Sequence, residues 1–522
     1  MDRIIVYEAN EVPERVLRWY ARAHPNSAIA TLLDRGGFAS TVNSDELVDR
    51  ELYPSQTWAT AATGVPYDKH GIYWYADPKP VDLPLYWQSA ARYRSVGVVG
   101  TLHSSPLSAS AGLENLKFCV PDIFADSSET IPAHLEGVQR FSMTMANQNA
   151  RSVGSRWPIL GYLRGLAGVL RAGVSPSTLA RLGSIAVAVA SKRIPKERLR
   201  TAHAVLMFDV FERQVKQHDT DLAVFFSNHV AAAMHRFWFA SFPDDWADEL
   251  YDRAWVERNL GELPAAVSEL DRQLGRLLRI CERTGRRLVV ISSMGQHGGE
   301  PLRDKSDRVF VVRQPAPFLA AIGVPPEAKE RAAMVPQLSA EYVSSDAAVV
   351  DKSRIEAAFP QLLVDCAGPV VTITYDLPVN EDGRVQLGSE MVDPASIGGE
   401  AIEVEEHRNG MHHPIGVLLS SAPFAENPGD TPVDTLALAP ALLAALSVPL
   451  EPHHIAPNWC CERPLRPVLP PAFRHGRPGA HAGDHPRQHY CDSVRPIRYG
   501  PIPVDALLCG RSVGSPIRTG PP

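Results

Sequence analysis

Residues 288–299 read LVVISSMGQHGG, a β-branched apolar run that stops in a turn built from Ser, Met, Gly, Gln and His. Four similar apolar runs are IIVY at 4–7, VGVVG at 96–100, LAVFF at 222–226 and GVLLS at 416–420. Each run is followed by a turn or by a helical pattern. Alternation of short buried strands with helices is typical of a mostly parallel sheet that helices cover on both faces. The sequence therefore predicts an α/β fold of this kind.

The residues that follow these runs are candidates for a site, because ligands of such sheets bind at the carboxyl ends of the strands. They are Glu8, Leu102 to Ser105, Asn228 with His229, Ser293 with Met294, and the loop around His412.

The composition of the chain excludes several classes of protein. It has 522 residues, 45% of them hydrophobic, and a formal net charge of −7, which argues against general affinity for nucleic acid. No stretch approaches the roughly 18 continuous apolar residues of a membrane helix. The N-terminus MDRIIVYEA enters a predicted strand without a basic leader. We therefore expect a cytoplasmic protein without a transmembrane segment, of unknown oligomeric state.

The pattern predicts one α/β domain over residues 1–455 with two additions. Residues 126–218 indicate a helical insertion, which we expect to form a cap over the active-site edge of the sheet, although its basic amphipathic helices could also bind a membrane surface or a partner. Residues 369–407 predict a small antiparallel β-hairpin addition. Residues 459–522 contain twelve Pro, nine Arg and no Lys. This composition predicts a disordered tail, or an out-of-frame translation of coding sequence.

The most informative motif is PSQTWATAATGVPYDKHGI at residues 54–72. Pro54 predicts the start of a helix, TWATAAT supplies a short Ala/Thr helix, and Gly64 followed by Pro66 ends it. Thr57 then lies in the first turn, where free backbone N–H groups and the helix dipole favour an anion. A hydroxyl there could attack phosphorus, although for an isolated motif the better interpretation is that Ser55 and Thr57 only cap the helix.

This motif resembles the nucleophile region of the type I phosphodiesterase and nucleotide pyrophosphatase family, which is part of the alkaline phosphatase superfamily. The family pattern is a Pro, a spacer, a Thr or Ser nucleophile that begins a helix, then TG, a Pro and HGI. Three other segments resemble the family: IIVYEA its first strand, MHRFW at 234–238 the end of a metal-binding helix, and GMHHPIGVLL at 410–419 a late metal-binding segment. The matches extend from residue 3 to about 455.

The resemblance implies an alkaline-phosphatase-like fold and a divalent-metal site. In that family two zinc ions about 4 Å apart activate the nucleophile and neutralise the phosphoryl oxygens. It implies that Thr57 is the nucleophile, that Glu8 stands where the first-strand Asp usually binds metal, and that His235 and His412 are metal ligands. It further implies zinc, as one or two ions, and a small phosphorylated substrate.

Two of the family's metal-ligand positions differ in this chain. The helix has Ala231 where the family has Asp four residues before His235, so a ligand shifted upstream to Asn228 or His229 is a possible replacement. The family's Asp-His-Gly corresponds to Ser293-Met294-Gly295, and neither Ser nor Met suits a phosphatase zinc.

Other side chains near the altered second position could contribute to the site. Asn10 or Glu11 could add an oxygen donor, and His297 could turn back toward it. We therefore expect Asn10, Ser293 and His297 to contact the substrate.

Three functions remain open. The first is a metal-dependent hydrolase of a phosphate ester or diester that uses a Thr nucleophile. The second is a catalytically impaired relative that binds a phosphorylated or glycan-linked ligand. The third is a phosphate or sulfate transferase, although the chain has no Cys-x-Pro-x-Arg sulfatase signature.

Overall fold

The computed structural model divides into two units, residues 1–466 and residues 467–522, and the described residues all belong to the first. The residues that it describes are 2–47, 50–110, 112–151, 168–169, 171–247, 250–299, 308–403, 408–424 and 431–454. The tail expected from residue 459 lies outside these ranges. So do parts of the two expected additions, at 152–167, 170 and 404–407.

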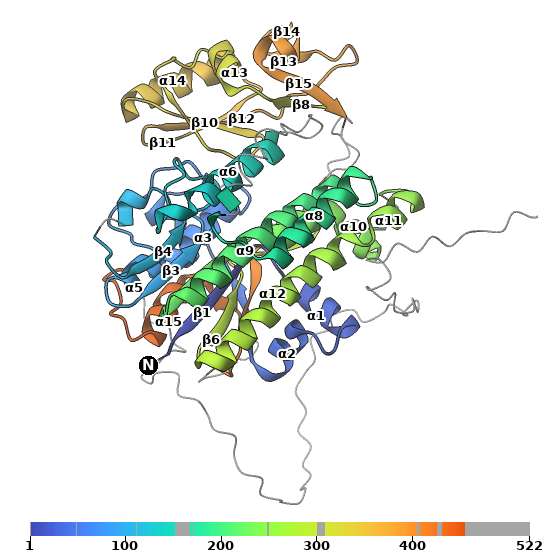
Figure 1. Ribbon diagram of the computed structural model, residues 1–522. Helices are drawn as coiled ribbons and strands as arrows, with labels where there is room; N and C mark the ends of the chain where they lie inside the picture. The colour runs from blue at the N-terminus through green and yellow to red at the C-terminus, as the bar shows by residue number, and fades with distance from the viewer. Residues whose placement is uncertain are drawn as a thin grey trace, which may run out of the picture. The chain divides into compact units, whose positions relative to one another are not determined.

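An eight-stranded sheet has the order β18-β2-β17-β6-β1-β5-β3-β4 (Figure 1). Its strands are β1 (Ile4–Ala9), β2 (Gly37–Val42), β3 (Val96–Val99), β4 (Leu116–Val120), β5 (Leu222–Ser227), β6 (Arg287–Ile291), β17 (Ile415–Ser420) and β18 (Val433–Asp434). Strand β17 pairs antiparallel with β2 and β6, and the other neighbours pair parallel. All five predicted runs lie in this sheet, so the α/β prediction is confirmed.

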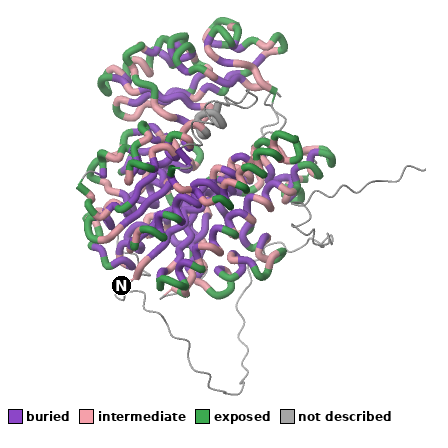
Figure 2. Tube along the Cα trace, in the orientation of Figure 1, coloured by how far each residue is buried: buried purple, intermediate pink, exposed green. Residues whose placement is uncertain are grey.

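Helices cover both faces of the sheet, as the alternation of β1 requires. Ile5 and Tyr7 belong to one buried cluster, and Ile4 and Val6 belong to the other. The first cluster includes α1 (Glu14–Ala23), α2 (Ala28–Arg35), α9 (Leu199–Gln217), α10 (His229–Ser241) and α12 (Glu262–Thr284). The second includes α3 (Pro54–Thr63), α5 (Tyr86–Ala91) and α15 (Leu438–Ala445). The central strands are accordingly buried on both sides (Figure 2).

Helix α3 forms within the motif at 54–72, where the sequence predicts it. Pro54 occupies its first turn, and Gly64 ends it in the left-handed conformation with φ +68°. A side chain at position 64 would be strained at this φ, which explains the glycine. A short helix α4 (Tyr67–His70) follows. The motif therefore builds one well-defined helix whose first turn lies at the carboxyl edge of the sheet.

The expected insertion at 126–218 contains α6 (Glu136–Arg151), α8 (Pro176–Ala190) and α9. Helix α9 is not a peripheral element, because Leu206, Phe208 and Phe211 pack in the core against the sheet. Further helices are α11 (Arg253–Asn259), α13 (Pro315–Ala321) and α14 (Ser345–Ala358). Among the described helices, none is long and apolar enough to cross a membrane.

Antiparallel strands occupy the region from Arg308 to Glu403, which begins earlier than the expected addition. One sheet has the order β11-β12-β10-β9, and two further pairs are β13-β14 and β15-β8. Their bounds are β8 (Arg308–Val312), β9 (Lys329–Arg331), β10 (Gln337–Glu341), β11 (Leu363–Ala367), β12 (Val370–Thr374), β13 (Val385–Leu387), β14 (Glu390–Val392) and β15 (Gly399–Glu403). A separate cluster of buried side chains, including Phe318 and Tyr375, forms their core.

Candidate metal centre

A short antiparallel ribbon continues the chain beyond β6 and leads into β17. It pairs β7 (Gly295–Gly298) with β16 (Gly410–His413), so that His412 lies opposite Gln296 and Met411 lies opposite His297. Because side chains alternate along a strand, Gln296 and His412 share one face and His297 lies on the other. Gln296 is buried and His297 is exposed. The ribbon therefore directs Gln296 and His412, and not His297, toward the protein interior.

Three side chains from separate elements meet on that inner face. His235 comes from α10, His412 from β16, and Glu11 from the turn after β1. Glu11 Oε2 lies 3.0 Å from His235 Nε2 and 3.4 Å from His412 Nε2. The donor atoms of the three side chains all lie within 4.8 Å of one another. Ligands of a tetrahedral zinc ion, with bonds of about 2.05 Å, are about 3.3 Å apart, so these three residues have nearly the spacing of a metal site.

Electrostatics favour a cation at this position. Burial opposes ionisation of Glu11, but charge interactions with His235 and His412 outweigh it and hold the pKa of the Glu11 carboxyl well below its usual range. Burial lowers the pKa of His235 in spite of its carboxylate neighbour. Metal binding requires an ionised Glu11 and a neutral His235, so a cation would take the place of the imidazole proton beside the carboxylate.

Hydrogen bonds with neighbouring groups fix the orientation of His235 and Glu11. His235 Nδ1 donates to Gly410 O at 2.8 Å, which leaves the lone pair of Nε2 facing Glu11. The other Glu11 oxygen, Oε1, accepts from Asn10 Nδ2 at 2.8 Å. Asn10 Nδ2 also donates to Asn228 Oδ1 at 2.7 Å. Asn10 and Asn228 thus lie next to the centre and hold its carboxylate in place.

Of the three side chains, that of His235 is the most exposed. The side chains of Glu11 and His412 are 2% and 7% exposed, whereas that of His235 is 24% exposed. Glu11 also has a left-handed backbone, with φ +57°. A non-glycine residue in this conformation costs about 1 kcal/mol or more and is uncommon. Two histidines and one carboxylate fit zinc, and the same set also holds iron(II) in other proteins.

Helix α3 begins beside this centre and carries Thr57. The Tyr53 ring, just before the helix, packs edge-on against His412 with ring centroids 6.3 Å apart. Trp58 Nε1 donates to Asn10 Oδ1 at 2.7 Å. Thr57 Oγ1 lies 2.8 Å from Ser293 Oγ, and both residues are fully buried, with 0% exposure. The structure therefore brings Thr57 and Ser293 into contact with each other, next to the three-residue centre.

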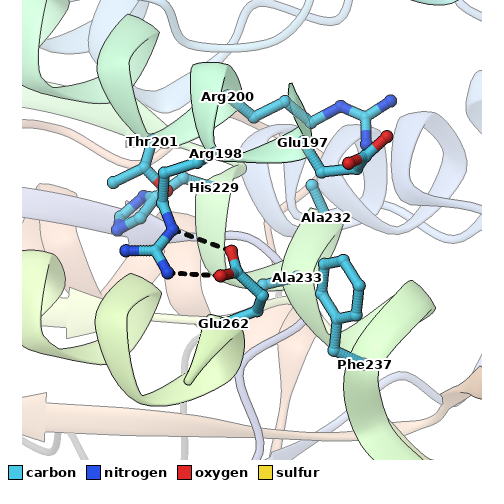
Figure 3. A pocket seen from close by; sticks show the side chains of 9 residues that line it. All are labelled: Glu197, Arg198, Arg200, Thr201, His229, Ala232, Ala233, Phe237 and Glu262. Carbon is cyan, nitrogen blue, oxygen red and sulfur yellow. Dashed lines mark hydrogen bonds and ion pairs between the residues drawn. The ribbon is translucent and has the colours of Figure 1, made fainter. Parts of the chain in front are cut away.

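His229 does not lie with the other two histidines. It is the first residue of α10, where Nδ1 contacts Ser227 Oγ at 2.8 Å and Nε2 contacts Ala266 O at 3.1 Å. Burial lowers its pKa to about 4. It lines a separate cavity of about 10 Å³, next to the ion pair of Arg198 with Glu262 (Figure 3). Such a cavity holds at most one water molecule, so His229 is a core histidine with both nitrogens in use.

Glu8 also has a different environment from the one expected of a metal ligand. It points to the face of the sheet that α5 covers, where its Oε1 accepts from Tyr86 Oη at 2.9 Å. Its Oε2 has no hydrogen-bond partner among the described residues. Burial raises its pKa to about 7. Glu8 is therefore a buried acid that is about half protonated at pH 7.

We expect the substitution Glu8→Gln to stabilise the protein at high pH. The folded carboxyl has a pKa of about 7 and an ordinary glutamate carboxyl one of 4.5, so the stability of the wild type falls as the pH rises through this window. The cost of ionising buried Glu8 reaches about 3 kcal/mol above it. Urea unfolding should show that the free energy of unfolding of the variant, relative to that of the wild type, rises by about this amount from pH 5 to pH 8. A variant that loses stability at pH 8, or that binds metal more weakly, would indicate that Glu8 acts as an anion.

Glu11 and Gln296 are the residues of the site that sequence patterns indicate least. Glu11 is one of two possible oxygen donors after the first strand, and nothing in the sequence favours it over Asn10. No sequence pattern indicates Gln296, because the turn at Ser292 to Met294 decides which residues of β7 face the protein interior. Met294, in the place of the family's metal-binding His, is fully buried.

No family model matches the chain, and no curated protein matches it. Solved structures match at low identity. Murine ectonucleotide pyrophosphatase/phosphodiesterase 5 is 11% identical with a TM-score of 0.36, over 89% of this chain and 100% of that one. Phosphonoacetate hydrolase from Sinorhizobium meliloti is 14% identical with a TM-score of 0.38, over 86% and 95%. A mutant of the alkaline phosphatase PafA is 10% identical with a TM-score of 0.40, over 88% and 98%.

The three TM-scores are below 0.5, so these likenesses assign no chemistry to the centre.

Proposed function

We propose that the protein is a metal-dependent hydrolase of phosphate esters or diesters that binds one divalent cation at Glu11, His235 and His412. The observation that supports this most is the convergence of these side chains, with 3.0 and 3.4 Å between the carboxylate oxygen and the two imidazoles. A carboxylate and imidazoles are ligands for zinc and for other transition metals. When bound, such a cation supplies a Lewis acid that neutralises phosphoryl oxygens.

In this proposal Thr57 is the nucleophile and Ser293 positions it. Ser293 Oγ lies 2.8 Å from Thr57 Oγ1, so it orients the hydroxyl and exchanges a hydrogen bond with it. The N–H groups of Ser55 and Gln56 in the first turn of α3 have no partner within the helix, and they are suited to phosphate oxygens. Thr57 attack on phosphorus would form a phosphorylated threonine and release one alcohol, which takes the hydroxyl proton; water would then release phosphate where the substrate is a monoester, or a phosphomonoester where it is a diester.

A second candidate function is binding of a phosphorylated ligand without turnover. Two observations favour it. Thr57 is fully buried, whereas a nucleophile has to reach its substrate. Ser293 and Met294 also replace the residues that would hold a second metal in the resembling family. The two candidates share the metal centre and differ in whether the ester is cleaved.

Metal dependence of hydrolysis tests the first candidate. We expect protein stripped with a chelator to lose hydrolysis of an aryl phosphodiester and an aryl phosphomonoester, and to regain it with Zn²⁺, Mn²⁺, Co²⁺ or Fe²⁺. The measurement is release of the coloured phenol against metal concentration. If the protein binds metal and inorganic phosphate but cleaves neither ester, the second candidate is correct. Turnover that survives complete removal of metal would contradict the first.

A further inference from the structure

The Gln296 side chain lies where it would meet a cation at the centre. Its amide nitrogen donates to Glu11 Oε2 and lies 3.1 Å from His235 Nε2. These are two of the three atoms that would bind the cation. The NH₂ group thus bridges two acceptors, at 3.0 Å from each other, that would otherwise repel.

The other end of the amide is unsatisfied. Gln296 is 2% exposed, and its Oε1 has no hydrogen-bond partner in the part of the chain that the structure describes. A buried carbonyl oxygen without a partner costs about 1 to 3 kcal/mol. This oxygen lies against Gly410: a Cβ at Gly410 would be 2.7 Å from Gln296 Oε1 and 2.4 Å from Met234 O. Gln296 Oε1 and Met234 O therefore lie next to the same point beside Gly410.

We propose that Gln296 is the fourth ligand of the cation and binds it through Oε1 after its amide turns over. This inference rests on the metal site of the proposed function. The oxygen and NH₂ ends of an amide have nearly the same size, so the turn requires no repacking. It gives the unsatisfied Oε1 a cationic partner and brings the NH₂ group to the side of Met234 O. The contact of Nε2 with Ala231 O, at 3.3 Å, is lost.

A neutral fourth ligand has a consequence for the substrate. Glu11 contributes one negative charge, so a divalent cation held by Glu11, two neutral imidazoles and an amide leaves a net charge of +1. Arg408 adds a positive charge nearby, because its Nε donates to Gly410 O at 3.1 Å. A cationic centre favours an anionic ligand such as a phosphate group over a neutral ester. A second carboxylate in place of Gln296 would cancel this preference.

The experiment measures Zn²⁺ affinity by competition with a chromophoric chelator. Gln296→Leu removes both polar atoms, whereas Gln296→Glu keeps an oxygen donor. We expect Gln296→Leu to weaken Zn²⁺ binding by about 10- to 100-fold and Gln296→Glu to restore it or improve it. The matched control Gln386→Leu, at an exposed position of β13, should leave the affinity unchanged. The visible absorption bands of the Co²⁺-loaded protein should shift in Gln296→Leu and not in the control.

The possible failures are distinguishable. If the wild type binds no Zn²⁺ or Co²⁺, the proposed metal site itself is wrong, and the inference with it. If the wild type binds metal and Gln296→Leu has the same affinity and spectrum, Gln296 is not a ligand, although the site stands. Tighter binding by Gln296→Leu would show that the amide competes with the cation, which also overturns the inference. Thermal unfolding of each variant confirms that it is folded.

Discussion

Thr57→Ala is expected to lower kcat/KM for phosphate ester hydrolysis by about a thousand-fold or more, because it removes the proposed nucleophile. The side chain is fully buried and its hydroxyl lies 2.8 Å from Ser293 Oγ. The substitution leaves Ser293 without this partner, which costs about 1 to 3 kcal/mol of stability. The rate is therefore compared at a temperature at which both proteins are folded, as circular dichroism can establish.

The conservative variant Thr57→Ser separates the chemistry from the packing. It keeps the hydroxyl beside Ser293 and loses only a methyl group, so it should retain much of the activity that Thr57→Ala loses. If Thr57→Ala hydrolyses the ester as fast as the wild type, Thr57 is not the nucleophile. If the wild type has no turnover but Thr57→Ala binds inorganic phosphate more weakly, the non-catalytic function gains support.

Glu11→Gln is expected to weaken Zn²⁺ affinity by about 100-fold or more. Structural zinc sites have binding free energies of about 10 to 16 kcal/mol, so one of three or four ligands accounts for several kcal/mol. Glu11 supplies the only anionic donor of the centre among the described residues. Gln keeps the length of the side chain, and when its oxygen accepts from Asn10 its NH₂ group faces the cation, so the loss reports both the charge and the donor oxygen. Isothermal titration calorimetry with Zn²⁺ measures it.

Two matched pairs of variants control this experiment. Glu14 lies in α1, three residues after Glu11 in the sequence, and its carboxylate pairs with Arg18. Glu14→Gln should leave Zn²⁺ affinity unchanged. His412→Ala should abolish tight binding, whereas His413→Ala should not, because adjacent residues of β16 point to opposite faces. Equal affinities for Glu11→Gln and Glu14→Gln would exclude Glu11 as a ligand.

Sequence patterns indicate the central strands of the fold better than the two strands at the β18-β2 end of the sheet. The apolar runs at 4–7 and 222–226 become β1 and β5, which are buried on both sides and therefore have continuous apolar sequences. Strand β2, GFASTV, alternates between buried and half-buried residues, and β18 has only two residues. Neither has the run of β-branched residues that marks a central strand.

The sequence predicts a residue of the site where a motif fixes its position. It does not do so where a turn decides which side chain faces the centre. His235 and His412 come from segments with a recognisable pattern, and the structure brings them together. Glu11 reaches them through a left-handed turn at φ +57°, which no sequence pattern marks. Whether Gln296 or His297 faces the centre depends on the register of β7 with β16. A shift of one residue would exchange the two side chains.

Crystals of Zn²⁺-loaded protein, measured with X-rays on both sides of the zinc absorption edge, would locate the ion. We expect one anomalous peak per chain, at about 2 Å from the donor atoms of Glu11, His235 and His412. A map without a peak between these three side chains, or with its peak among Glu8, Thr57 and Ser293, would contradict the assignment of the metal centre.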